Sequence, residues 1–406
     1  MKKNLKVLLG AAVIAMVVTA CSGSDTGSET VKAPVKKAEE KKGVVLKIAL
    51  WGAAGEEKAL KEAAKGLEEA VEGIDSVVWE QYPSVEEFYD TLPTETAIGK
   101  IPDIVILNNE EQKTLIEAGM LEAFDEIPDS GQYVGNVLEE WIYKDKLYGI
   151  PTSAAPALFI INEDMWKAAG LTDCPETWEQ VYEDAKVLRE NGYMPLCIDI
   201  GNVYHVTQYL LAFGGGWNQG IDMNTEQNKE AVAYILKMFD EGLAVTALEE
   251  GKSWDGEVFN AGKCVMSTGG TWYIGAMKDT PEIHYRMIQM PCTENSSKKA
   301  LHSYGISVMS SAGNKEAAKK AAAYLAREEA QAVRMKITGD CPSLLSLQDA
   351  YFEQYPDLAF MREDLSDTVG FDYPVDLFIL DKVQEKLEQR IYGKEPQLTP
   401  DDILTP

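Results

Sequence analysis

The amino-acid sequence predicts an α/β fold arranged in two lobes. From Val44 onward, short apolar runs alternate with amphipathic stretches of helical length. Strands that alternate with helices in this way imply a sheet covered on both faces. About 364 residues follow position 42, which is too many for one simple core and enough for two. Residues 1–42 differ in composition and are not expected to join either lobe.

The first 20 residues are typical of a bacterial export signal. Three lysines precede an uncharged apolar run at 8–18, and that run is shorter than the roughly 20 residues that a membrane-spanning helix needs. The next residues, VTAC, resemble a bacterial lipobox that ends at Cys21. The resemblance implies cleavage after residue 20 and a diacylglyceryl group on the sulfur of Cys21. The alternative is an ordinary secretory signal with a chance cysteine.

Residues 21–43 are expected to form a lipidated cysteine followed by a disordered tether. The stretch from Ser22 to Lys42 has no aromatic residue and almost nothing aliphatic, so it cannot bury enough apolar surface to offset its ordering entropy. A flexible segment of this length reaches roughly 25 Å. Such a tether would hold a folded body clear of the membrane and confine it to the outer face of the cell membrane.

The charge of the chain excludes anionic partners. It has 38 Lys and Arg against 66 Asp and Glu residues, a net charge of −28, and loss of the signal segment would make this about −31. Nucleic acids and anionic membrane surfaces bind basic proteins. We therefore expect no nucleic acid partner and no charge-driven membrane binding. A neutral ligand remains open.

The spacing of cysteine and histidine indicates neither a disulfide framework nor a metal site. Five cysteines follow Cys21, an odd number without a CxxC pair. Cys197 and Cys264 lie in apolar strand-like runs, where a buried thiol is the usual state. Three histidines stand far apart in the sequence. We expect no metal and no cofactor.

The first α/β run covers the segment up to Gly119. Its predicted strands are 44–51, 76–81 and 101–107, and its predicted helices are 56–71, 85–98 and 110–118. Ligands of such sheets bind beyond the carboxyl ends of the strands. This rule indicates the loops at 51–55 and 108–110.

A second run begins near Leu147. We expect strands at 157–162, 263–268 and 306–309, and helices at 163–169, 177–191, from about 204, at 272–278 and at 315–335. In the last helix, Glu316 and Lys320 stand at the supporting i, i+4 spacing.

Five motifs occur in order along these elements. They are PDIVILNN at 102–109, LYGIP at 147–151, INEDMWKAAGL with PETWEQ at 161–180, VFNAGKCVMSTGGTW at 258–272 and GISVMSSAGNKEAAKKAAAYL at 305–325. Together they resemble the extracellular solute-binding proteins of the carbohydrate group, which includes maltose-binding protein. The likeness spans nearly the whole chain after the tether. The loops that would set specificity match nothing known, so the solute stays open.

The resemblance implies a two-lobed periplasmic-binding-protein-like fold of class II type, with each lobe a sheet flanked by helices and a hinge between them. Lobe 1 would comprise 44–150 plus 305–340, and lobe 2 would comprise 151–304 plus 341–406. It also implies a monomer that closes around a small solute, most simply a sugar or oligosaccharide. The permease subunits of an ABC-type importer would be its partner.

A sugar presents apolar C–H faces and a ring of hydroxyls, so its site needs aromatic side chains and polar forks. The resemblance indicates Trp272 first, because the matching Trp of maltose-binding protein stacks on sugar. Gly270 would let a ligand approach the backbone closely. Asn108, Asn109 and Glu110 lie where the family presents polar contacts. The alternatives are core packing for Trp272 and helix capping for the asparagines.

Further candidates lie at four other places in the chain. Two flank the first strand–helix loop, three begin the helix near 204, one follows three glycines, and two lie near the C-terminus: Trp51 and Glu56; Tyr204, His205 and Gln208; Trp217; Asp372 and Tyr373. For each, packing or surface exposure is the alternative. Trp166 and Trp178 fall on helices at core spacing and are predicted to pack.

Two other classes of function compete with a sugar-binding protein. A surface lipoprotein enzyme such as a glycosidase would need two carboxylates at a defined separation, and among 66 acidic residues no pair stands out. The sequence has no GxSxG, HExxH or P-loop. We therefore expect no enzyme. The same fold could instead carry a peptide, a polyamine or a metal, although few histidines argue against metal cargo.

Overall fold

The computed structural model describes residues 43–51, 54–82, 85–110 and 112–405. The predicted signal segment, Cys21 and almost all of the tether lie outside this part of the chain. No helix within it combines the length and the apolar character that crossing a membrane requires.

The first sheet has the strand order β2-β1-β3-β15-β4, and β7 also pairs with β15. Its first three strands are parallel, and β15 runs antiparallel to β3. The strands are β1 (Val44–Trp51), β2 (Ile74–Tyr82), β3 (Ile104–Asn108), β4 (Leu121–Glu122), β7 (Ile150–Pro151) and β15 (Tyr304–Met309). Its helices are α1 (Ala54–Ala63), α2 (Leu67–Ala70), α3 (Val85–Ala97), α4 (Gln112–Glu117), α11 (Lys315–Ala326) and α12 (Glu328–Thr338).

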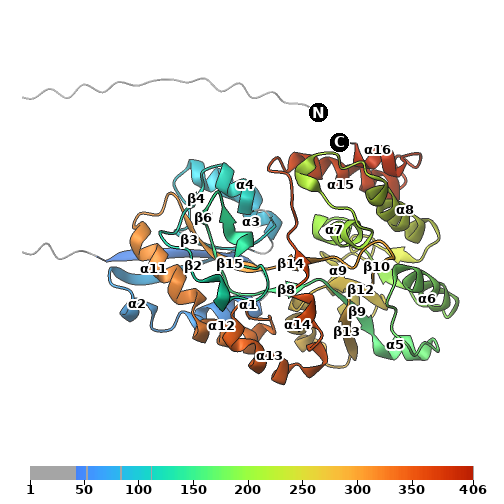
Figure 1. Cartoon of the computed structure of the whole chain (residues 1–406), viewed down its shortest axis with the longest axis horizontal. Helices are drawn as coiled ribbons and strands as arrows, with labels where there is room; N and C mark the ends of the chain where they lie inside the picture. Colours follow the sequence, from blue (N-terminus) through green and yellow to red (C-terminus); the bar gives the residue numbers. More distant parts are fainter. Residues whose placement is uncertain (1–42, 52–53, 83–84, 111, 406) are drawn as a thin grey trace, which may run out of the picture. The chain divides into compact units, whose positions relative to one another are not determined.

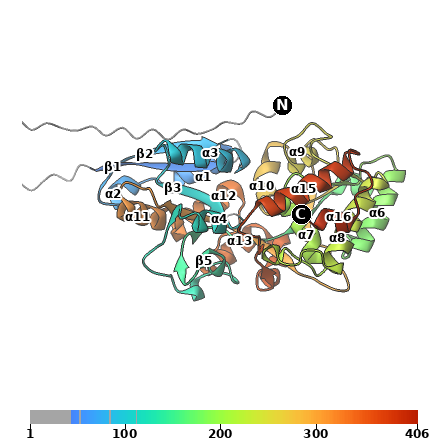
Figure 2. The same cartoon turned by 90° about the horizontal axis from the view of Figure 1, so that it is seen from above.

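The second sheet has the order β11-β10-β12-β9-β13, and β9 is antiparallel to both of its neighbours. The strands are β9 (Leu158–Asn162), β10 (Leu196–Cys197), β11 (Ala244–Val245), β12 (Met266–Gly269) and β13 (Tyr285–Gln289). The helices around it are α5 (Glu163–Ala168), α6 (Trp178–Glu190), α7 (Val203–Ala212), α8 (Glu226–Asp240), α9 (Asp255–Asn260), α10 (Trp272–Ala276), α15 (Phe378–Ile391) and α16 (Pro400–Leu404). Figures 1 and 2 show the two groups side by side.

A small third sheet lies between the two groups in Figure 1. It consists of β8 (Ala155–Pro156), β14 (Lys299–His302) and β16 (Thr368–Val369), in the order β16-β14-β8. The chain enters β9 from β8, enters β15 from β14 and reaches α15 from β16, so all three crossings between the two groups pass through this sheet. The predicted changes of lobe near 150 and 305 fall on β7 and β15.

The remaining elements are short. They are the hairpin β5 (Ile142–Tyr143) and β6 (Lys146–Leu147), the helices α13 (Gln348–Gln354) and α14 (Met361–Asp364), and the 3-10 helices Ser130–Gln132, Glu139–Trp141, Asn218–Gly220, Met277–Asp279, Leu345–Leu347 and Pro356–Leu358.

Two predicted long helices are each broken in two. Residues 56–71 form α1 and α2 because Gly66, between them, takes a left-handed conformation with φ of 82°. Residues 315–335 form α11 and α12 because Arg327 is extended, with ψ of 165°. The predicted strand at 44–51 matches β1 in full.

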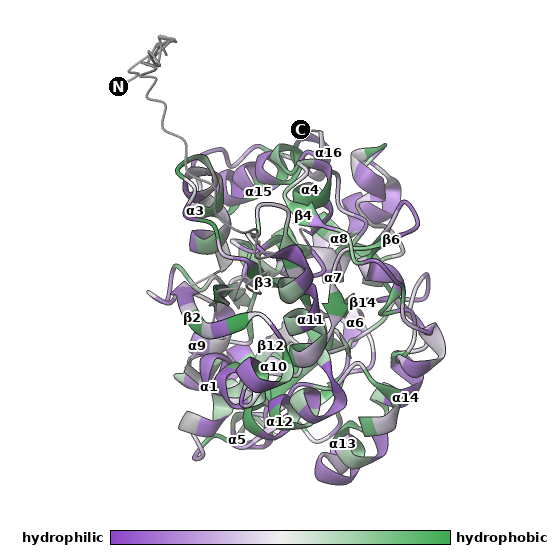
Figure 3. Cartoon of the chain, turned by 90° about the vertical axis from the view of Figure 1, so that its left-hand side faces the viewer, coloured by the Kyte–Doolittle hydropathy of each residue, from purple (hydrophilic) through white to green (hydrophobic). Residues whose placement is uncertain are grey.

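The predicted core residues are confirmed. Trp166 and Trp178 are buried, and so are Cys197 and Cys264. In Figure 3 the helices carry both hydrophobic and hydrophilic colour, as expected for elements with one buried face. Packing of apolar faces does not explain why some polar side chains are also buried.

Candidate functional site

Side chains from both large sheets converge where the chain crosses between them. β1 and β3 end in Trp51 and Asn108, and β12 is followed by Trp272. β14 ends in His302, and β15 begins with Tyr304. We call the group the aromatic–acidic site and define it by eight residues: Trp51, Glu56, Glu110, Tyr204, Trp272, His302, Tyr304 and Arg334.

The rings of this site form a continuous chain of contacts. Trp51 lies 6.3 Å from Tyr304, and Tyr304 lies 4.8 Å from His302, measured between ring centroids. His302 in turn lies 4.7 Å from Trp272 and 5.9 Å from Tyr204. The interplanar angles of these four contacts run from 53° to 87°. Outside the site, Trp51 also stacks on Phe88 at 29° and is tilted at 44° to Tyr89. Tilted and edge-on contacts leave ring faces that are not covered by a parallel neighbour.

Trp272 is half-buried and packs against both hydrophobic cores. Its ring lies beside Gly270, where an added Cβ would stand 2.1 Å from the ring. The open space that the sequence assigned to a ligand at Gly270 is therefore taken up by Trp272 itself. Tyr204 adds an edge-on contact at 5.4 Å and donates a hydrogen bond to the Gly269 carbonyl at 3.0 Å.

The charged part of the site centres on Arg334 of α12. Its guanidinium lies 2.5 Å from Glu56 and 2.6 Å from Asp340, and it sits 4.8 Å from the Tyr304 ring centroid. Burial raises the pKa of Glu56 to about 7, although Arg334 opposes the rise. Burial acts to lower the pKa of Arg334, but the two carboxylates outweigh it and the pKa is raised. This network places a buried positive charge beside an aromatic face.

Glu110 and His302 meet in the middle of the site. Nε2 of His302 lies 3.7 Å from Oε1 of Glu110. Burial lowers the pKa of His302 to about 4, so the ring is neutral at pH 7. Burial also raises the pKa of Tyr204 and of Tyr304, and the Glu110 carboxylate adds to the rise in both. The Glu110 carboxylate therefore raises the pKa of one tyrosine from each group of elements.

The two asparagines differ in what they contact. Asn109 donates from Nδ2 to the Leu301 carbonyl at 2.8 Å and accepts from the Ser303 N–H at 2.9 Å, so it joins β3 to the crossing strand. Asn108 pairs with Tyr304 in the sheet. Its buried Oδ1 receives no hydrogen bond from any residue that the structure describes. Asn108 is therefore the better of the two for a ligand contact.

Helix α7 divides its three candidates between the site and the core. Tyr204 faces the aromatic–acidic site. His205 is buried and contacts Thr268 and Asp255, at 2.7 Å and 3.5 Å. Gln208 is buried and donates to the Tyr204 carbonyl at 3.2 Å. His205 meets the site through the Tyr204 ring, 5.1 Å away between centroids, but its ring nitrogens face Thr268 and Asp255.

The candidate after three glycines and one of the two near the C-terminus lie in the second core. Trp217 is 1 % exposed and donates from Nε1 to the Thr207 hydroxyl at 2.7 Å. Tyr373 is buried against the same hydroxyl at 3.1 Å. Asp372 is exposed, with φ of 50°. The residue that the structure does bring to Tyr204 is Phe371, with ring centroids 5.7 Å apart.

Sequence reasoning missed several residues of this region. They are His302, Tyr304, Arg334, Asp340, Phe371 and Glu140, whose pKa burial raises to about 7. The signal for two of them was available, because the polar and aromatic HSY at 302–304 directly precedes the returning strand. Arg334 carries no such signal, since a helical arginine reads as solvent-exposed.

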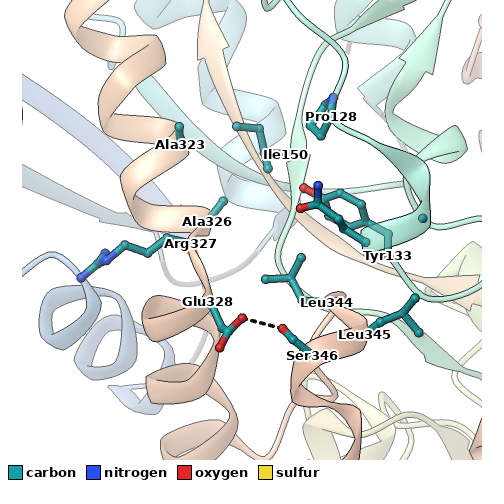
Figure 4. A pocket seen from close by; sticks show the side chains of 12 residues that line it. Pro128, Tyr133, Ile150, Ala323, Ala326, Arg327, Glu328, Leu344, Leu345 and Ser346 are labelled. Carbon is teal, nitrogen blue, oxygen red and sulfur yellow. Dashed lines mark hydrogen bonds between the residues drawn. The ribbon is translucent and has the colours of Figure 1, made fainter.

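A separate pocket of about 560 Å³ lies away from these residues. Figure 4 shows it between the α11–α12 junction and the loops near Tyr133 and Leu344. Two polar side chains in its wall are already paired: Arg327 donates to the Ala63 carbonyl, and Glu328 accepts from Ser346, another residue of the wall, at 2.6 Å. No candidate from the sequence lines it.

Comparison with known proteins relates this chain to transport proteins. The galactooligosaccharide-binding protein of Bacillus subtilis is 23% identical over 364 residues, covering 86% of this chain and 82% of the relative. A probable amino-acid ABC transporter periplasmic-binding protein of Sinorhizobium fredii is 26% identical over 213 residues, 50% of this chain and 48% of the relative.

The fold is shared with solved structures. An ABC substrate-binding protein of Listeria monocytogenes, in complex with cycloalternan, superposes with a TM-score of 0.77 at 22% identity. The match covers 89% of this chain and 96% of the other. The two-lobed class II architecture expected from the sequence is therefore confirmed. The family model described as bacterial extracellular solute-binding protein matches residues 53–332, and this chain belongs to that family.

Proposed function

We propose that this solute-binding protein carries a sugar or oligosaccharide, held at the aromatic–acidic site and delivered to an ABC-type importer when the lobes close on it. The observation that carries the proposal is the chain of tilted rings from Trp51 to Tyr204, which meets buried carboxylates and an arginine in one place.

The rings supply what the apolar faces of a sugar require. Trp272 and Tyr204 lie on α10 and α7, helices around the second sheet, whereas Tyr304 and Trp51 belong to strands of the first. A pyranose ring seated among them would lose water from its C–H faces. Contacts to both lobes at once favour the closed form, because only that form makes all of them.

The polar groups supply what the hydroxyls require. Glu110 and Glu56 can accept hydrogen bonds, Arg334 can donate them, and Asn108 has an acceptor oxygen that no described residue uses. Carboxylate and guanidinium groups make the stronger, charge-assisted bonds. The relative named for galactooligosaccharides fits this chemistry.

The location of the protein forms part of the same proposal. A lipid on Cys21 and a tether over 21–43 would keep a monomeric body within reach of its permease at the outer face of the membrane. The lobe boundaries would be 44–150 plus 305–340 for lobe 1 and 151–304 plus 341–406 for lobe 2. We propose no catalytic activity for the protein.

A thermal-shift panel of mono- and oligosaccharides tests the proposal, using the full chain with Cys21→Ser to prevent lipidation. A sugar at 100 times its Kd should stabilise the fold by about 2.7 kcal/mol. Trp272→Ala should abolish this shift. The matched control is Trp79→Ala, which removes another half-buried tryptophan from β2, away from the site; its sugar-induced shift should remain.

Two results would replace the proposal. Shifts with amino acids or peptides and none with sugars would make the cargo a non-sugar solute. Release of chromophore from a chromogenic oligosaccharide, lost in Glu110→Gln, would make the protein a glycosidase-like enzyme.

A further inference from the structure

A second polar cluster lies inside the second lobe, behind Tyr204. We call it the inner cluster, and it consists of Asp199, His205 and Asp255. Asp199 follows β10, His205 lies in the first turn of α7, and Asp255 begins α9. Each offers one ligand atom, and these atoms all lie within 4.8 Å of one another. Sequence spacing carries no signal for it, because Asp255 lies 50 positions beyond His205 although Asp199 and His205 are only six positions apart.

The three side chains are almost removed from solvent. Asp199 is 8 % exposed, His205 is 5 % exposed and Asp255 is fully buried. Two carboxylates in the same interior region repel each other, so burial requires positive charge or protons at that place. Oδ1 of Asp199 accepts a hydrogen bond from the Gly201 N–H at 3.1 Å; buried aspartates usually have such partners or a metal.

The two oxygens of Asp255 have different surroundings. Oδ2 accepts from the Ser267 hydroxyl at 2.6 Å and from the Tyr273 hydroxyl at 2.8 Å. Oδ1 is buried, and no described residue donates a hydrogen bond to it. Nε2 of His205 lies 3.5 Å from Oδ1, whereas a charged N–H···O bond would be about 2.7–2.9 Å.

That separation suits two ligands of one metal ion. Two atoms bound about 2.0–2.1 Å from a tetrahedral ion stand roughly 3.3 Å apart. The other ring nitrogen of His205, Nδ1, is fixed at 2.7 Å from the Thr268 hydroxyl. Histidines that bind metal through one nitrogen usually hydrogen-bond through the other, which fixes the tautomer and the ring orientation.

We propose that Asp199, His205 and Asp255 bind one divalent metal ion, zinc or manganese. Imidazole nitrogen together with carboxylate oxygen suits these ions, and a charge of +2 balances the two carboxylates. The ion would fasten the first turn of α7 to α9 and to the segment that follows β10. Tyr204, whose ring lies 5.1 Å from the His205 ring, would thereby be held toward the aromatic–acidic site.

Metal analysis of the full chain with Cys21→Ser tests this directly. We expect about one equivalent of zinc or manganese per chain after incubation with either ion and desalting. EDTA should lower the Tm, and adding the ion back should restore it. His205→Gln and Asp255→Asn should reduce the metal content at least about 10-fold, and Thr268→Val should weaken affinity by about 10–100-fold.

His284→Gln is the matched control. His284 also contacts an aspartate, Asp164 at 2.9 Å, but both side chains are exposed; this variant should keep its metal. Asp199→Asn replaces Asp255→Asn if the latter fails to fold. A wild-type chain that retains no ion and whose Tm ignores EDTA overturns the proposal, as does equal loss of metal in His284→Gln. Metal content needs no sugar, so failure here leaves the proposed function standing.

Discussion

The two large sheets bring different chemistry to the aromatic–acidic site. The first sheet and its helices contribute the charged groups of the site, Glu56, Glu110 and Arg334. They also contribute two of its rings, Trp51 and Tyr304. The second contributes rings, through Tyr204 and Trp272. His302 and Tyr304, on the crossing strands, join the two sides.

Because of this difference, we expect substitutions on the two sides to have different effects. A buried charge is tolerated only while its partners hold it, so removing one member of the Arg334 network leaves others uncompensated. An aromatic ring of the site is held by packing along its edges. Removing or trimming it should therefore mainly weaken the binding of a ligand that stacks on its face. Substitutions on the charged side should therefore mainly lower the free energy of unfolding, and substitutions on the aromatic side should mainly raise the Kd of the sugar.

The largest effect is expected for Arg334→Met. The change keeps an unbranched apolar side chain but leaves Glu56 and Asp340 without their buried cation. Breaking a buried pair from one side costs about 3–5 kcal/mol. Urea unfolding of the unliganded protein should show a loss of this size.

Lys320→Met is the control for this prediction. Lys320 pairs with Glu316 on the surface of α11, where both side chains are mostly exposed, and its loss should cost no more than about 0.5 kcal/mol. Adding Glu56→Gln to Arg334→Met should recover part of the lost stability. Equal stability of the Arg334 and Lys320 variants would remove the distinction between buried and exposed charge.

Much of the fold could be predicted from the sequence because its signals are local. The apolar run at 44–51 is β1 in full, and the strands at 157–162 and 263–268 differ from β9 and β12 by at most three residues. The helix breaks at Gly66 and Arg327 were not predicted, because each is a change of backbone conformation at one residue within a run whose apolar spacing continues across it.

The site could be predicted only in part. Candidates at strand ends, such as Trp51 and Glu110, are placed by the general rule for such sheets, and the structure brings them together. The direction of a side chain on a helix is set by packing instead, so His205 turns inward beside Tyr204, which faces the site. Trp217 could not be assigned from its glycines, because its hydrogen bond to Thr207 exists only in the folded core.

The buried carboxyl group of Glu140, beside Asn109, predicts that the stability of the charged side depends on pH. Burial raises its pKa in the folded state from 4.5 to about 7. The folded protein then holds a proton that the unfolded chain releases, so this residue lowers stability as pH rises from about 4.5 through about 7. Glu140→Gln should remove that cost and gain roughly 1–3 kcal/mol near pH 8 relative to pH 4.

Unfolding curves at the two pH values measure this difference. Glu353→Gln, on the exposed side of α13, should show the same stability as the wild type at both. A Glu140 variant that gains nothing at high pH would mean that the carboxylate is solvated in the folded state.

The smallest effect is expected for Tyr204→Phe, on the aromatic side. The change removes one hydroxyl, which donates to the Gly269 carbonyl at 3.0 Å, and keeps the ring contacts with Trp272 and His302. The loss of one buried hydrogen bond costs about 0.5–1.5 kcal/mol of stability. Because sugar would rest on ring faces, its Kd should stay within about 3-fold of wild type, a change worth less than 1 kcal/mol.

Titration calorimetry with the sugar found in the panel measures this Kd. The control is Tyr234→Phe, which trims a tyrosine away from the site, where its hydroxyl donates to the Trp178 carbonyl. A loss of affinity beyond 10-fold in Tyr204→Phe alone would show that the aromatic side also works through its polar atoms, and the division of labour between the two sheets would no longer hold.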